Sequence, residues 1–151
     1  MSTEAIIAAR RNRMAVLARC KSSRLQELWD GLGFEPAYRV LRGPESGLVM
    51  LRGRIGGTGD AFNIGEATVT RASVKLDDGN VGHAMALGRD MAKARLSALI
   101  DALCQNPETA AFIDAQVIAP IKRELDDADE RRRQETAATR VDFFTMVRGE
   151  D

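Results

Sequence analysis

The chain has 151 residues, enough for one ordinary domain with a sizeable core, and its 22 basic and 22 acidic side chains give a formal net charge of zero. Residues 1–60 carry ten Lys/Arg against six Asp/Glu and the remainder twelve against sixteen, which excludes the basic excess typical of nucleic-acid binding. The sequence shows no apolar run of about 18 residues and no signal-peptide core, and two cysteines with one histidine cannot form a closed zinc site alone, so we expect a cytoplasmic protein with no membrane partner and no metal of its own.

Residues 1–35 are predicted to be helical. Thr3 is a suitable N-cap for the first helix. The apolar residues that recur there at helical spacing are Ile7, Met14, Leu17 and Ala18. A second, shorter helix is indicated by the stripe Leu25, Leu28, Trp29 and Leu32. Trp29 lies on this stripe and is therefore interpreted as a core residue rather than a ligand platform.

The apolar pattern changes to a period of two between residues 38 and 88, which predicts an antiparallel sheet of about four or five strands. The segments expected to form strands are Tyr38–Arg42, Gly47–Ile55, Phe62–Leu76 and Val81–Leu87. Asp77-Asp78-Gly79-Asn80 is a hairpin signal, because Gly and Asn accept the positive φ angles of tight turns. Phe62–Leu76 is long for one strand, so Gly65-Glu66 is expected to form a bulge.

Residues 89–135 are again predicted to be helical. Asp90 can cap one helix, and Asn106-Pro107 supplies the cap and first-turn proline of another. Further along, Asp127–Arg131 and Asp129–Arg133 have the i, i+4 spacing of ion pairs on a solvated helix face. The whole chain, residues 1–151, is therefore expected to be a single α+β domain with helices on either side of an antiparallel sheet.

The first candidate site is the glycine-rich segment Gly56-Gly57-Thr58-Gly59, with Arg54 beside it. Successive glycines allow backbone N–H groups to converge on an anion, and an arginine adds a bidentate donor. The segment lacks the Gly-Lys-Ser/Thr ending of a Walker loop and leads from strand to strand rather than into a helix. A tight connection between strands is the other interpretation, and both stay open.

His83 is the only side chain with an unperturbed pKa near neutrality, and it shares a strand face with Val81, Met85 and Leu87. Such a histidine is more often packed or interfacial than catalytic. The opposite face carries the small residues Gly82, Ala84, Ala86 and Gly88, which permit close approach by a helix or a partner. Arg52, Arg54, Arg71 and Arg89 either converge on a phosphonate or triphosphate or are ordinary surface arginines.

Residues 139–149 form an apolar tail with bulk on both faces of an extended chain. Val141 and Phe143 point one way, and Phe144 and Met146 point the other. A free segment of this kind would aggregate, so it needs cover. It is interpreted either as a last strand or helix packed on its own domain or as a docking arm on a partner.

Four segments together resemble the PhnG family, the small G subunit of the bacterial carbon–phosphorus lyase core complex. They are Arg54-x-Gly56-Gly57-Thr58-Gly59, Thr70-Arg71-Ala72, Leu87-Gly88-Arg89-Asp90 and Arg140-Val141-Asp142-Phe143-Phe144-Thr145-Met146-Val147-Arg148-Gly149. The resemblance covers most of residues 38–149. It implies an assembly with the H, I, J and K subunits. It also implies that, together with the H, I and L proteins, the chain takes part in transferring a phosphonate to C1′ of the ribose of MgATP with release of adenine.

The resemblance assigns no catalytic residue to this subunit, and the radical chemistry of the pathway belongs to the J subunit. We therefore expect an accessory subunit that binds no cofactor alone, MgATP being a substrate of the complex. The chain alone is expected to turn over neither MgATP nor phosphonate. Two alternatives remain: a shared active site in which Arg54 and Gly56–Gly59 contact the triphosphate, and a non-catalytic scaffold whose interface includes the tail or His83.

Overall fold

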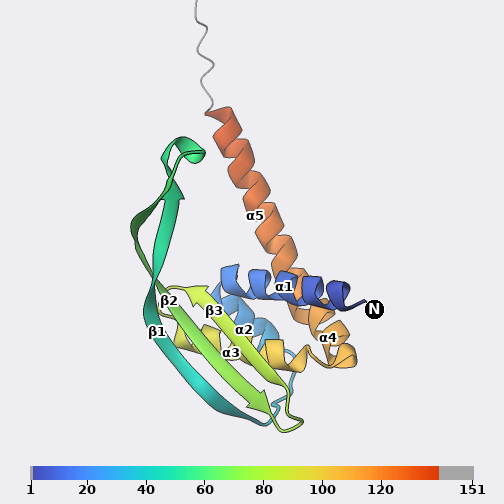
Figure 1. Ribbon diagram of the computed structural model, residues 1–151. Helices are drawn as coiled ribbons and strands as arrows, with labels where there is room; N and C mark the ends of the chain where they lie inside the picture. The colour runs from blue at the N-terminus through green and yellow to red at the C-terminus, as the bar shows by residue number, and fades with distance from the viewer. Residues whose placement is uncertain (1, 140–151) are drawn as a thin grey trace, which may run out of the picture.

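The computed structural model describes residues 2–139 and shows an α+β fold in which helices lie before and after an antiparallel sheet (Figure 1). The chain begins with helices α1 (Thr3–Arg19) and α2 (Ser22–Asp30). The N-cap of α1 is Ser2 rather than the predicted Thr3, because the Ser2 hydroxyl accepts a 3.3 Å hydrogen bond from the Ala5 N–H. Ile7 was expected on the buried stripe but is 62% exposed, and residues 3–8 of α1 do not pack on the body.

The sheet has three strands in the order β1 (Tyr38–Arg54), β2 (Ala61–Leu76) and β3 (Val81–Leu87), all antiparallel. The prediction of four or five strands was too high because Tyr38–Arg42 and Gly47–Ile55 join into one strand. Gly43-Pro44 does not break it. β1 is an edge strand, where a proline is tolerated, and register shifts on either side of Arg42, between Val40 and Glu45, absorb the irregularity.

Helix α3 (Met91–Leu103) packs against one face of the sheet and contacts all three strands. The closest approach is at Gly82 of β3, where an added Cβ would lie 2.0 Å from the Ala98 carbonyl oxygen and 2.4 Å from the Ala102 nitrogen. The expectation of close approach over the small-residue face of β3 is thus confirmed, and the approaching element is this chain's own helix.

The chain ends, within its described part, in helix α4 (Pro107–Ile113), one π-helical turn η2 (Asp114–Ile118) and helix α5 (Ala119–Ala138). Asp90 and Asn106 cap α3 and α4 as predicted. The expected ion pairs along α5 were wrong in detail. Asp129 receives two 2.7 Å hydrogen bonds from Arg19 of α1 instead, because α1 and α5 lie in contact.

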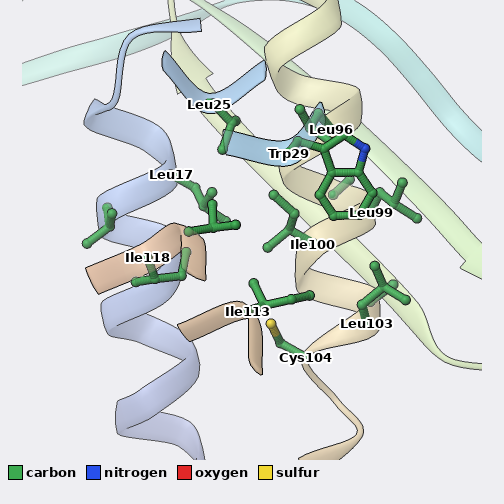
Figure 2. Packing of buried hydrophobic residues seen from close by; sticks show 14 of the residues in the cluster. Leu17, Leu25, Trp29, Leu96, Leu99, Ile100, Leu103, Cys104, Ile113 and Ile118 are labelled. Atoms are coloured by element: carbon green, nitrogen blue, oxygen red, sulfur yellow. The ribbon is translucent and has the colours of Figure 1, made fainter. Parts of the chain in front are cut away.

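The core lies between α3, the first two helices and the start of the C-terminal helices (Figure 2). Leu25, Ile100 and Ile113 are completely buried, and Trp29 is 8% exposed, as the prediction of a core tryptophan requires. Between residues 2 and 139 no helix is long and apolar enough to cross a lipid bilayer.

Candidate functional site

A two-stranded arm projects from the body of the molecule. We define the arm as residues 47–68: the far half of β1, the 3-10 turn η1 (Ile55–Gly57) and the first half of β2. In Figure 1 the arm and α5 rise from the same end of the body. The arm residues pair with one another, and none of them is buried. An isolated two-stranded ribbon is at best marginally stable in water, so the arm is the least supported part of the sheet.

The arm carries large apolar side chains that the chain's described part leaves uncovered. Six of them are between 44% and 67% exposed: Leu48, Met50, Leu51, Ile55, Phe62 and Ile64. They occur on both faces, since Leu48 and Leu51 lie three positions apart along one strand and successive side chains alternate between its faces. Large apolar side chains exposed together in this number mark an interaction site. The arm is therefore the clearest candidate for a docking surface.

The arm has a bulge, one residue before the predicted Gly65-Glu66. The pairing moves from Leu51 with Gly65 to Arg52 with Asn63, which leaves Ile64 without a partner on β1. The Ile64 side chain lies over Gly53, where an added Cβ would be 2.4 Å from its Cδ1 atom. Gly53 thus provides the space that the bulged isoleucine fills.

The glycine-rich segment lies at the tip of the arm and connects β1 to β2. Gly56 and Gly57 both have positive φ angles, 57° and 82°. The Gly59 N–H donates a 2.8 Å hydrogen bond to the Ile55 carbonyl, and Arg54 Nη1 donates one of 3.2 Å to the Gly59 carbonyl. The predicted residues Arg54, Gly56, Gly57, Thr58 and Gly59 are therefore brought together, with part of their hydrogen-bonding capacity used to close the turn.

A shallow depression beside this turn is lined by Arg52, Gly53, Arg54, Gly57 and Ala61. Arg52 and Arg54 are both exposed and lie two residues apart on the same strand face. The tip thus presents two guanidinium groups to solvent. This arrangement suits an anion or an acidic side chain of a partner.

His83 lies on the outer face of β3, turned away from α3. Its Nδ1 atom is 2.8 Å from the Ser73 hydroxyl, and its backbone N–H donates to Asp101. Met85 and Leu87 on the same face are 58% and 74% exposed. The structure therefore places His83 beside exposed apolar side chains. The other predicted interface residues, Val141, Phe143, Phe144 and Met146, lie outside the described residues.

Asp101 was not singled out from the sequence, although it connects three elements. It is 4% exposed and lies on α3. It accepts hydrogen bonds from Arg10 Nε at 2.9 Å, Arg10 Nη2 at 2.8 Å and the His83 backbone N–H at 2.9 Å. The two bonds that Arg10 donates to Asp101 raise the pKa of Arg10, against the opposing effect of burial. The available signal was an acidic residue within the apolar stretch Leu99–Leu103.

Two of the short segments that carry the family resemblance, Thr70–Ala72 and Leu87–Asp90, take part in hydrogen bonds that hold neighbouring elements together. The Thr70 hydroxyl is buried, lies 2.8 Å from the Ser46 hydroxyl and donates a 2.7 Å hydrogen bond to the Gly88 carbonyl. Arg71 bonds Glu45 across the sheet at 2.8 Å. Asp90 accepts a 2.8 Å bond from the Lys93 N–H, which lowers the pKa of its carboxyl group. These residues fix the turn from β3 into α3 and the base of the arm.

Neither cysteine is suited to act as a nucleophile. Both are buried, and burial raises the pKa of each thiol, to about 12 for Cys104. A thiol with such a pKa stays protonated near neutral pH. Among residues 2–139, no group of three or more His, Cys, Asp and Glu side chains is placed to hold a metal ion.

Comparison with known proteins identifies the family. The family model described as phosphonate metabolism protein PhnG matches residues 8–149. The chain belongs to the PhnG family. A curated relative from Rhizobium meliloti (strain 1021) is 52% identical over 150 residues, covering 99% of this chain and 96% of the relative. That protein is named alpha-D-ribose 1-methylphosphonate 5-triphosphate synthase subunit PhnG.

Membership of the PhnG family confirms the resemblance noted in the sequence. It gives the chain a place in phosphonate metabolism and relates it to a subunit of a synthase. An exposed apolar arm is the feature expected of a protein that is one part of a larger assembly.

Proposed function

We propose that this chain is an accessory subunit of a phosphonate ribosyl-triphosphate synthase in organic phosphonate catabolism. With its H, I and L partners it takes part in a reaction in which a phosphonate oxygen bonds to C1′ of the ribose of MgATP while the bond from C1′ to adenine breaks. The catalytic groups lie on a partner, and this subunit supports and shapes their site. MgATP is a substrate of the complex, and this subunit binds no cofactor alone.

The observation that carries the proposal is the 52% identity, over nearly the whole of both chains, to a protein named as a subunit of such a synthase. The exposed apolar arm supports it independently. A lone protein in water gains nothing from keeping side chains such as Leu48 and Ile64 63% exposed, whereas a subunit buries them on assembly. The partners are proposed to be the H, I, J and K subunits of a cytoplasmic core complex, with L joining for the transfer reaction.

Co-expression with these partners, followed by size-exclusion chromatography with mass analysis, tests the proposal. We expect one large particle that releases adenine from MgATP when L and a phosphonate are added, and no adenine release by this chain alone. Partners assembled without this chain should lose the activity. Adenine release by the isolated chain would overturn the accessory role. Full activity, in lower yield, of partners lacking the chain would support the pure scaffold instead.

The shared-site alternative, in which Arg54 and Gly56–Gly59 contact the triphosphate, is tested by Arg54→Ala. If the two guanidinium groups at the tip bind the triphosphate, the variant complex assembles normally and its KM for MgATP rises about tenfold or more, as expected when a charged hydrogen bond to phosphate is lost. Arg39→Ala, an exposed arginine near the base of β1, is the matched control. Normal assembly with an unchanged KM would remove Arg54 from the active site.

A further inference from the structure

Strand β3 is shorter than β2 and pairs with only half of it. β3 pairs with residues 69–75 of β2, from Val69 with Leu87 to Lys75 with Val81. Residues 61–68 continue β2 into the arm, where they pair only with β1. Within residues 2–139 the sheet has three strands, so the side of residues 61–68 that continues the β3 row has no neighbouring strand. We call this side the β2 edge.

Hydrogen bonding at the end of β3 shows which backbone groups point to the β2 edge. The Gly88 N–H donates a 2.9 Å bond to the Thr68 carbonyl, so Thr68 presents its backbone groups toward the β3 row. Backbone groups of an antiparallel strand alternate between its two sides. Glu66, two residues earlier and before the bulge at Ile64 is reached, therefore presents its N–H and C=O to the β2 edge. An unpaired row of this kind is a template for another strand.

The side chains of residues 61–68 define what the β2 edge can accept. Phe62 and Ile64 are 47% and 63% exposed, and Glu66 is the only charged residue in the segment. Glu66 forms no salt bridge with the described residues, and its partner on β1 is Met50. Cross-strand pairs stabilise a sheet when apolar residues face apolar residues and opposite charges face each other. A matching strand is apolar and carries Lys or Arg opposite Glu66.

The outer edge of β1 is interrupted at the base of the arm. Pro44 lacks an N–H, and the pairing shifts register twice between Val40 and Glu45. Proteins protect edge strands with prolines and irregularities of this kind. Residues 61–68 contain neither proline nor lysine. The bulge at Ile64 is their only irregularity, and pairing with β1 resumes at Asn63.

We propose that an extended segment of a partner subunit adds to the β2 edge as a fourth strand, alongside residues 61–68, with a basic residue opposite Glu66. The proposal deepens the accessory role and rests on it, since the strand comes from a protein of the same assembly. Strand addition supplies the second neighbour that β2 lacks in the arm and covers Phe62 and Ile64. It makes the arm part of a sheet shared between two subunits.

Amide hydrogen exchange, resolved by residue, tests the placement in the purified complex against the isolated chain. We expect the Glu66 N–H to exchange at least about tenfold more slowly in the complex, because a new backbone hydrogen bond must open first. Val40 of β1, which lies outside the arm, is the internal control. Its partner Val74 presents its backbone groups toward β3, so the Val40 N–H faces the opposite edge of the sheet and keeps its rate.

The paired variants Glu66→Pro and Glu66→Ala test the backbone contact itself. Both remove the carboxylate, but only proline removes the N–H, which faces away from β1 and is not needed for the arm's own pairing. We expect the proline variant to bind the partners at least about tenfold more weakly than the alanine variant. Far-ultraviolet circular dichroism and thermal melting of each isolated variant check that the chain is folded. If the proline variant fails this check, the exchange measurement on the unaltered complex decides alone.

The outcomes separate this proposal from the accessory role. Failure of the unaltered chain to join its partners would overturn the proposed function and strand addition with it. Assembly without slowed exchange at Glu66, or equal binding by the proline and alanine variants, would overturn strand addition only. The Glu66 N–H could instead exchange slowly in the isolated chain, and more slowly at higher protein concentration. That result would assign the β2 edge to a second copy of this chain and likewise overturn the proposal.

Discussion

Replacing Gly82 by alanine will lower the free energy of unfolding by about 3 kcal/mol, at the upper end of the range usual for overpacked cores. The new Cβ would meet the Ala98 carbonyl oxygen at 2.0 Å and the Ala102 nitrogen at 2.4 Å. Both are backbone atoms of α3, so no side chain can rotate away to make room. The helix must move outward from β3, which loosens its contacts with Ala84 and with the core beneath.

Urea denaturation of the isolated chain measures the effect of Gly82→Ala, with Gly47→Ala as the matched control. Gly47 is also a strand glycine of the same sheet, but an added Cβ there meets no atom within 4 Å. The control should leave the urea midpoint unchanged or raise it slightly, because alanine restricts the unfolded chain. Similar midpoints for the two variants would show that α3 does not pack on β3 as closely as described.

The N-caps of α3 and α4 and the turn between β2 and β3 were predictable because their signals are local. Asp90, Asn106-Pro107 and the Asp77–Asn80 hairpin each act through hydrogen bonds within a few residues, and the structure has all three. The number of strands was not predictable in the same way. Gly43-Pro44 reads as a break, and only knowledge that β1 is an edge strand shows that the strand can continue through it.

Long-range pairing limited the prediction further. The i, i+4 rule gave Asp129 a partner on its own helix, whereas the structure gives it Arg19, 110 positions away. Asp101 likewise depends on Arg10 and on the backbone of His83, which no local pattern connects to it. Local rules rank neighbours along one element, and they carry no information about which elements cross.

In the candidate site, too, the local turn was predictable and the long-range arrangement was not. The glycine-rich segment Gly56–Gly59 located the turn at the tip of the arm. The alternating apolar pattern of the strands could not show that this part of the sheet leaves the body. One signal was present. Leu48-Val49-Met50-Leu51 is a continuous apolar run, which in strands is typical of burial on both faces. The chain's described part covers neither face there, so this run is best explained by cover from another subunit.

Replacing Asp101 by alanine will lower the free energy of unfolding by about 2–3 kcal/mol, mainly because the partly buried backbone N–H of His83 loses its acceptor. The Asp101 side chain is 3% exposed, and the His83 N–H has this carboxylate as its partner in the structure. Arg10 is 39% exposed and can return to water, so its share of the loss is the smaller one. The change also removes the only side-chain link from α1 through α3 to β3 in the described part of the chain.

Asp129→Ala is the control that isolates burial in this comparison. Asp129 also accepts two hydrogen bonds from one arginine, Arg19, but its side chain is 29% exposed, against 3% for Asp101, and Arg19 is 52% exposed. Its removal should leave the urea midpoint unchanged, because water replaces the lost partner at little cost. Slower exchange of the His83 N–H in the unaltered chain than in Asp101→Ala, with no such change in Asp129→Ala, would confirm the bond to Asp101. Equal destabilisation by the two alanines would contradict it, since the effect would then follow from losing any arginine–aspartate pair rather than from leaving the His83 N–H without its acceptor.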